Sequence, residues 1–250
     1  MRAKLQRPLT GLGVAAFWLL VWYGVARAIG EVLLLPTPWE VAKALWRMAS
    51  TADFWRTVGG SLLRVVLGYG VAVAAGTGLA VLTARFKLLR VLCSPLLYLM
   101  RAVPVASFII LAYLWIQIRL LPGFIAFLMV VPVVWTNVRQ GIDQTDRRLL
   151  EMAQTYRLGR WRTLRHVWLP SVKPYFQAAC VTGLGFAWKS GIAAEVICSP
   201  SLAIGTELKN AKAYLETPEV FAWTVTVVLL SVLLERVLLW LLGRKKEGAA

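Results

Sequence analysis

Ionisable side chains occur inside long apolar stretches of this sequence, namely Arg64, Arg101, Lys189 and Glu195. Such a group near the centre of a membrane helix costs about 2.5–3.5 kcal/mol on insertion scales, so it needs a partner or a water-filled path. Lys189 and Glu195 are six residues apart, which is about 120° around a helix, so they do not face each other on one helix. Trp188 precedes Lys189 and shares the helical face of Glu195.

These charges admit more than one interpretation. The side chains either pair between helices or reach the headgroups, or they line a translocation pathway together with Trp188. Three cations against one acid would suit a small anion on such a pathway. Alternatively, Glu195 carries a proton in a proton-coupled secondary transporter. Many such folds contain corresponding broken helices in two halves of the chain, and this sequence shows no matching pair.

The sequence contains no arrangement of residues that predicts catalysis, a metal site or a bound cofactor. The only histidine, His166, lies among arginines with no orienting acid nearby, which indicates a surface or docking residue. Cys93, Cys180 and Cys198 lack the C-x-x-C spacing of a metal or redox site. The phosphate-loop pattern G-x-x-x-x-G-K-[S/T] is absent, so we expect a non-enzymatic chain; any ATP hydrolysis would need another polypeptide.

The composition predicts a protein that spans the lipid membrane several times. Hydrophobic residues make up 59% of the chain, and the mean hydropathy is +0.66. A soluble domain has about 45–50% apolar residues. A net charge of +16 could indicate nucleic-acid binding, but the basic residues lie beside apolar stretches, where they set membrane topology. We therefore expect a membrane protein without a nucleic-acid partner.

The apolar stretches predict a single all-α transmembrane domain over residues 1–250. About six spans are expected, at 11–30, 58–83, 91–116, 124–137, 171–198 and 220–242. Pro95 and Pro104 should kink or split the third span, and Pro132 should interrupt the fourth. Thr37, Pro38 and Glu40 form a capping-box pattern, which predicts a surface helix directly after the first span.

Basic residues gather beside alternate spans. They occur at the N-terminus, after the second span, in residues 139–173 and at the C-terminus. Short loops rich in lysine and arginine stay on the cytoplasmic side of the membrane. We therefore expect both termini, and the loop at 145–170, to be cytoplasmic.

The basic loop, residues 145–170, also has an apolar stripe. Thr145 or Asp146 can cap a helix, and Gly159 should mark a bend between two short helices. The apolar stripe consists of residues that recur at helical spacing, namely Leu149, Ala153, Tyr156 and Leu164. This face of the helices should therefore pack against another surface. This face fits a partner protein, and an amphipathic helix lying on anionic lipid headgroups is the alternative.

The basic loop resembles the EAA loop of ABC importer permeases. The family pattern is Glu-Ala-Ala, three residues, Gly, nine residues, Ile, any residue and Leu-Pro. The matching positions here are Glu151, Ala153, Val167, Leu169 and Pro170. Met152 replaces the alanine in the middle of Glu-Ala-Ala, and Arg157 stands where the family has glycine, although Gly159 could supply the same break. The resemblance implies that these residues, Arg157 and Gly159 included, couple the chain to an ATPase.

A second resemblance lies in the fifth span. The run W-K-S-G-I-A-A-E-V, from Trp188 to Val196, is similar to the corresponding segment of the nitrate, sulfonate and taurine permease branch. The two resemblances together imply a type I ABC importer permease fold in the bacterial plasma membrane. They also imply transport of a small solute, for which an anion such as a sulfonate, nitrate or taurine is a hypothesis.

The family further implies partners and cofactors. A second permease subunit would complete the pathway, as a homodimer or alternatively a heterodimer. Two ABC ATPase subunits would bind ATP and Mg, and an extracytoplasmic substrate-binding protein would deliver the solute. The helices between Glu151 and Val167 would lie in a groove of the ATPase.

Overall fold

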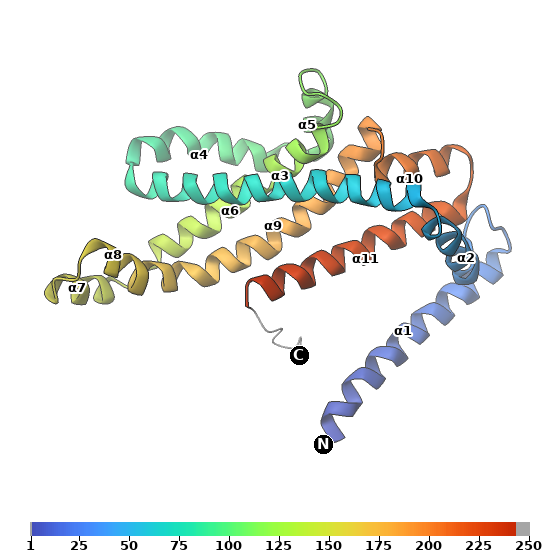
Figure 1. The fold of residues 1–250 in the computed structure, drawn as a ribbon, viewed down its shortest axis with the longest axis horizontal. Helices are drawn as coiled ribbons and strands as arrows, with labels where there is room; N and C mark the ends of the chain where they lie inside the picture. Colours follow the sequence, from blue (N-terminus) through green and yellow to red (C-terminus); the bar gives the residue numbers. More distant parts are fainter. Residues whose placement is uncertain (1, 244–250) are drawn as a thin grey trace.

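The computed structural model describes residues 2–243, and the side chains from residue 13 onward. This part of the chain is helical and contains no strand. Its elements, drawn in Figure 1, are α1 (Arg2–Ile29), α2 (Pro38–Ala49), α3 (Ala52–Arg85), α4 (Lys87–Ala102), α5 (Val105–Ala112), α6 (Leu121–Asp143), α7 (Arg147–Thr155), α8 (Arg160–Thr163), the π-helical segment η1 (Leu164–Trp168), α9 (Leu169–Cys198), α10 (Ile204–Ala213) and α11 (Thr217–Leu241).

Helices α3, α6 and α9 pack together at the centre of the bundle. Their contacts bury small and β-branched side chains, among them Val65, Ala72, Val130, Val134 and Ala187. A Cβ atom at Gly68 would lie 2.1 Å from the carbonyl oxygen of Gly123, so α3 and α6 can approach this closely only without side chains there. Small residues therefore permit the close packing of these two helices at this contact.

The third predicted span is broken, as its prolines predict. Helices α4 and α5 meet at an angle of 105° at residues 103–104, and Pro104 precedes the first residue of α5. Pro95, by contrast, lies inside α4 without ending it. The prediction that Pro132 interrupts the fourth span is wrong, because α6 runs unbroken from Leu121 to Asp143. A helix in a packed bundle tolerates a proline because neighbouring groups satisfy the freed carbonyl.

The helices differ in how clearly they qualify as membrane spans. By length and hydropathy alone, α3, α6 and α11 can each cross a membrane, and the bent α4–α5 pair would be a fourth span. Within the residues whose side chains are described, α1 adds an apolar helical segment, Gly13–Ile29. Helix α9 covers the predicted fifth span in 30 residues, but it carries Lys173, Lys189 and Glu195.

The predicted capping box begins α2. The backbone N–H of Thr37 donates to Glu40 Oε2 at 2.7 Å, and the N–H of Glu40 donates to Thr37 Oγ1 at 3.4 Å. Helix α2 then buries Val41 and Ala44 against Ala222 of α11. The capping box therefore fixes where the chain turns from α1 into the bundle.

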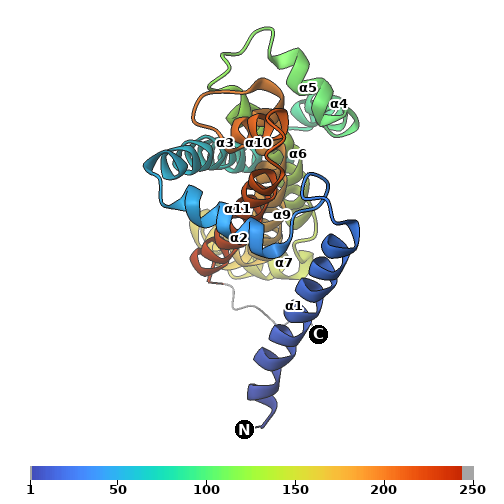
Figure 2. The same ribbon diagram turned by 90° about the vertical axis from the view of Figure 1, so that its right-hand side faces the viewer.

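The bundle has two distinct ends. Figure 1 shows α2 and α10 at one end, called here the α10 end, and α7 and α8 at the other, called the α7 end. Helix α1 projects away from the other helices in Figure 2. It contacts them near the α10 end, where Trp22 stacks on Phe221 with ring centroids 5.9 Å apart. The candidate functional residues lie at both ends of the bundle and in the helices between them.

Candidate functional site

The basic loop forms a compact projection at the α7 end, built from α7, α8 and η1. Asp146 is the N-cap of α7, because its Oδ1 accepts a hydrogen bond of 2.8 Å from the N–H of Arg148. Thr145, the other predicted cap, is buried and donates instead to the carbonyl of Gly141 at 3.1 Å. The start of α7 is thus fixed by one carboxylate.

The turn after α7 depends on Arg157. This residue has a φ of 49°, in the left-handed region that favours glycine. The N–H of Leu158 donates to the carbonyl of Ala153 at 2.8 Å, and the N–H of Arg157 donates to that of Gln154 at 2.9 Å. These two bonds make a Schellman motif, in which the left-handed position is usually glycine. The position where the resembled pattern has glycine therefore adopts a conformation that favours glycine, although the residue is an arginine.

Gly159 lies at the bend as predicted, but it does not supply the left-handed turn. Its φ of −61° and ψ of 154° are open to any residue, and a Cβ atom there would meet nothing within 4 Å. It serves as the N-cap of α8. The expectation that Gly159 replaces the family's glycine is therefore wrong, because Arg157 itself adopts that conformation.

The outer surface of the basic loop is both apolar and cationic. Within the predicted stripe, Ala153 is buried, whereas Leu149, Tyr156 and Leu164 remain exposed, with 74% of Tyr156 accessible. Glu151 is also exposed. Exposed arginines surround the stripe: Arg147, Arg148, Arg157, Arg160, Arg162 and Arg165. Because none of the described residues covers this stripe, it forms an exposed apolar surface of the kind that binds a partner.

The basic loop continues directly into a long helix of the bundle. Residues 160–198 are helical without interruption, through α8, η1 and α9. Val167 is buried, while Leu169 is exposed and begins α9 ahead of Pro170. The N–H of Leu169 donates to the carbonyl of Leu164, five residues earlier, which makes this a π-helical turn. A displacement of α8 would therefore be transmitted along the backbone into α9.

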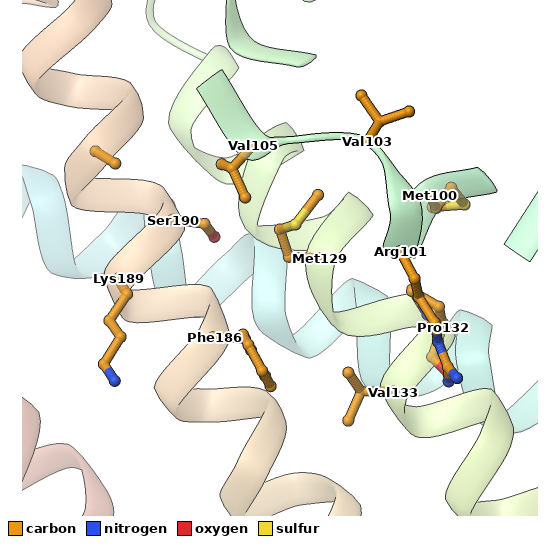
Figure 3. Close-up of a pocket in the computed structure, with 11 residues that line it drawn as sticks. Met100, Arg101, Val103, Val105, Met129, Pro132, Val133, Phe186, Lys189 and Ser190 are labelled. Atoms are coloured by element: carbon orange, nitrogen blue, oxygen red, sulfur yellow. The ribbon is translucent and has the colours of Figure 1, made fainter. Parts of the chain in front are cut away.

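A cleft of about 510 Å³ opens between α4, α5, α6 and α9. Figure 3 shows Arg101 and Lys189 on opposite sides of it, with Phe186 and Val133 between them. The remaining lining is mostly apolar, including Met100. Such a cleft offers positive charge and apolar walls to a small solute.

The two cations of the cleft differ in their contacts. Arg101 donates to the Pro132 carbonyl and to Thr136 Oγ1, so it ties the end of α4 to α6. Lys189 is exposed and has no hydrogen-bond or ion-pair partner among residues 13–243. Lys189 is therefore the cation that is free to contact a solute.

The other predicted pathway residues lie elsewhere. Glu195 is completely buried and pairs with Arg64, with Oε1 3.3 Å from Nη2. Trp188 is 2% exposed and donates from Nε1 to the carbonyl of Val227 in α11 at 3.0 Å. The structure thus brings Arg64 and Glu195 together as an ion pair, and it places Arg101 and Lys189 at the cleft. Ser61, which donates to Glu195, was not identified from the sequence because an isolated serine carries no spacing signal.

Comparison with known proteins relates most of the chain to one family. Residues 72–246 match the family described as "Binding-protein-dependent transport system inner membrane component". The taurine transport system permease protein TauC of Escherichia coli (strain K12) is 26% identical over 242 residues, which is 94% of this chain and 88% of that protein. The putative aliphatic sulfonates transport permease protein SsuC of the same strain is 29% identical, covering 88% of this chain and 82% of its own length.

More distant similarities extend to other transport proteins. The bicarbonate transport system permease protein CmpB of Synechococcus elongatus (strain ATCC 33912 / PCC 7942 / FACHB-805) is 24% identical over 75% of this chain and 68% of its own length. A bacterial ABC transporter involved in the import of the acidic polysaccharide alginate has the same fold, with a TM-score of 0.58. It is 15% identical, over 93% of this chain and 96% of that chain.

Replacing Arg157 by glycine should stabilise the turn after α7. A left-handed conformation costs a non-glycine residue about 1–2 kcal/mol, which glycine avoids. We expect slower amide hydrogen exchange of Leu158 in Arg157→Gly, measured on the purified protein. In the matched variant Gly159→Ala that amide should exchange at the unaltered rate, because the Gly159 backbone is unstrained. Faster exchange in Arg157→Gly would contradict this assignment of the turn.

Proposed function

The chain belongs to the inner membrane components of binding-protein-dependent transport systems, and we propose that it forms the pathway for a small anion. It is the transmembrane subunit of an ABC importer and a multi-pass protein of the inner membrane. Like its relatives, it is not itself an ATPase, and no phosphate loop occurs in its sequence. The basic loop, exposed and continuous with α9, is the observation that most strongly supports coupling to a separate ATPase.

The proposed partners follow from the two ends of the bundle. Two ATPase subunits, which bind ATP and Mg, would contact the basic loops at the α7 end. A second permease subunit, identical to this one, would complete the pathway, and the solute-binding protein would dock at the α10 end. The α7 end and both termini would then be cytoplasmic, which the distribution of basic residues supports.

The coupling mechanism uses the continuous helix. Closure of the ATPase pair would displace α7 and α8, whose exposed stripe and arginines would lie against it. The displacement would pass through η1 into α9, which carries Phe186 and Lys189 of the cleft. The cleft would then be open to one side of the membrane at a time.

A small anion suits the cleft best. Lys189 supplies an ammonium group without a described partner, and Arg101 adds a positive charge that is held against α6. The relatives are described as taurine, aliphatic sulfonate and bicarbonate permeases, and each of those solutes carries an anionic group. Neither the geometry nor the comparisons support proton coupling at Glu195, since its carboxylate is buried in an ion pair.

Removing the free cation should impair transport. In cells with the complete transporter, we expect Lys189→Gln to lower the uptake rate of labelled taurine, an alkanesulfonate or bicarbonate about tenfold. A hydrogen bond to a charged group contributes about 1.5–3 kcal/mol, and losing the lower value would slow uptake about tenfold. Arg236→Gln, which removes an exposed cation of α11 outside the cleft, is the matched control. Unchanged uptake by Lys189→Gln at equal assembly, or no uptake of any of these anions by the unaltered transporter, would contradict the proposal.

Reversing one charge in the basic loop should release the ATPase. We expect Glu151→Arg, and deletion of residues 155–160, to reduce co-purification of a phosphate-loop ATPase from detergent extracts about tenfold, as expected for a disrupted charge contact at an interface. Glu31→Arg, an exposed reversal in the segment between α1 and α2, should retain the ATPase. If Glu151→Arg and the deletion both keep a full complement of ATPase, the basic loop is not the docking surface.

A further inference from the structure

The most completely buried charge in the described bundle joins three helices at the α10 end. The Glu195 carboxylate, on α9, is 0% exposed. Its Oε2 accepts from Ser61 Oγ of α3 at 2.8 Å and from the N–H of Gly205 of α10 at 3.2 Å. Its Oε1 lies 3.3 Å from Nη2 of Arg64. We refer to Ser61, Arg64 and Glu195 as the Glu195 cluster.

The Glu195 cluster holds the beginning of α10. Ile204 and Gly205 are the first two residues of that helix, so their N–H groups have no partner within it. Ser61 Oγ accepts from the N–H of Ile204 at 2.9 Å while donating to Glu195. A carboxylate and a hydroxyl from two neighbouring helices thus cap α10, and a negative charge is favourable at this position.

Arg64 holds the segment between α9 and α10. Its Nη1 donates to the carbonyl of Ser201 at 3.2 Å, and its Nη2 donates to that of Leu202. Ser199 and Leu202 have φ values of 53° and 50°, left-handed conformations that persist only where the surroundings fix them. Every contact of the cluster therefore restricts how α10 can move relative to α3 and α9.

The approach of the backbones at this place is also unusually close. A Cβ atom at Gly60 would lie 2.5 Å from the carbonyl oxygen of Leu202, and one at Gly205 would lie 2.5 Å from Cβ of Glu195. Neither α3 nor α9 can therefore slide past α10 without first separating from it. The close backbone packing and the polar contacts therefore both hold α10 in place against α3 and α9.

A buried ion pair is poor evidence of stability, because desolvation offsets its attraction, whereas it can fix a unique arrangement of helices. We propose that Ser61, Arg64 and Glu195 are positioning residues that keep α3, α9 and α10 together as one rigid unit throughout the transport cycle. The unit then moves as one body when α9 is displaced through η1, and the relative motion that opens and closes the cleft takes place at the 105° break between α4 and α5. This role goes beyond the proposed function and does not depend on which solute is carried.

Amide hydrogen exchange tests the proposal directly, because the N–H groups of Ile204 and Gly205 report on the cluster. The complete transporter in lipid nanodiscs would be compared without nucleotide and after trapping with ATP and vanadate. We expect these two amides to stay equally protected in both states, while the amides of residues 102, 103 and 105 at the α4–α5 break change. Loss of protection at Ile204 and Gly205 in either state of the unaltered protein would overturn the proposal.

Two variants separate positioning from a purely structural role. Glu195→Gln and Ser61→Ala should speed exchange at Ile204 and Gly205 about tenfold, as expected for loss of a hydrogen bond to a charged group. Both should lower the maximal uptake rate without changing the KM for the loaded binding protein, while ATP hydrolysis continues. Ser61→Ala, which retains both charges of the ion pair, keeps the test valid if Glu195→Gln fails to assemble. Glu207→Gln, also on α10 but outside the cluster, is the control for both.

Faster exchange with unchanged uptake and unchanged coupling to ATP would overturn the positioning role. Unchanged exchange of the Ile204 amide in Ser61→Ala would overturn it as well. Neither result affects the proposed anion pathway, which depends on Lys189, so the two proposals can fail separately.

Discussion

The uninterrupted helical backbone from α8 through η1 into α9 is the constraint on which the functional account depends. Helical hydrogen bonds make such a segment stiff along its axis, so a force applied at the basic loop reaches the bundle. The same helix carries Lys189 at the cleft and Glu195 in the buried cluster. One element therefore connects the surface proposed to contact the ATPase with both groups of intramembrane charges.

The cost of a charge in an apolar environment explains how those charges are distributed. Arg64 and Glu195 neutralise each other and satisfy backbone groups of the α9–α10 connection. Arg101 is held by oxygen atoms of α6, which leaves Lys189 exposed beside an open cleft. The Arg64–Glu195 pair, Arg101 and Lys189 thus have different roles. In the sequence, each of them is simply a charged residue within an apolar stretch.

Much of the architecture could be predicted from the sequence because it depends on local chemistry. The capping box at Thr37 and Glu40, and the break at Pro104, follow from neighbouring residues and are confirmed. Two predictions failed for different reasons. Pro132 leaves α6 intact within the packed bundle. Arg157 adopts a left-handed conformation that its residue type disfavours, within the local hydrogen bonds that end α7. The pairing of Glu195 with Ser61 joins residues 134 positions apart, which no single-sequence periodicity can reveal.

Transport by reconstituted proteoliposomes tests the central claim most directly, namely that a separate ATPase drives this chain through the basic loop. The permease alone, and the complete complex, would be compared with ATP on the ATPase side or with a proton gradient alone. The account predicts uptake only by the complete complex with ATP. Uptake by the permease alone under a proton gradient would contradict it.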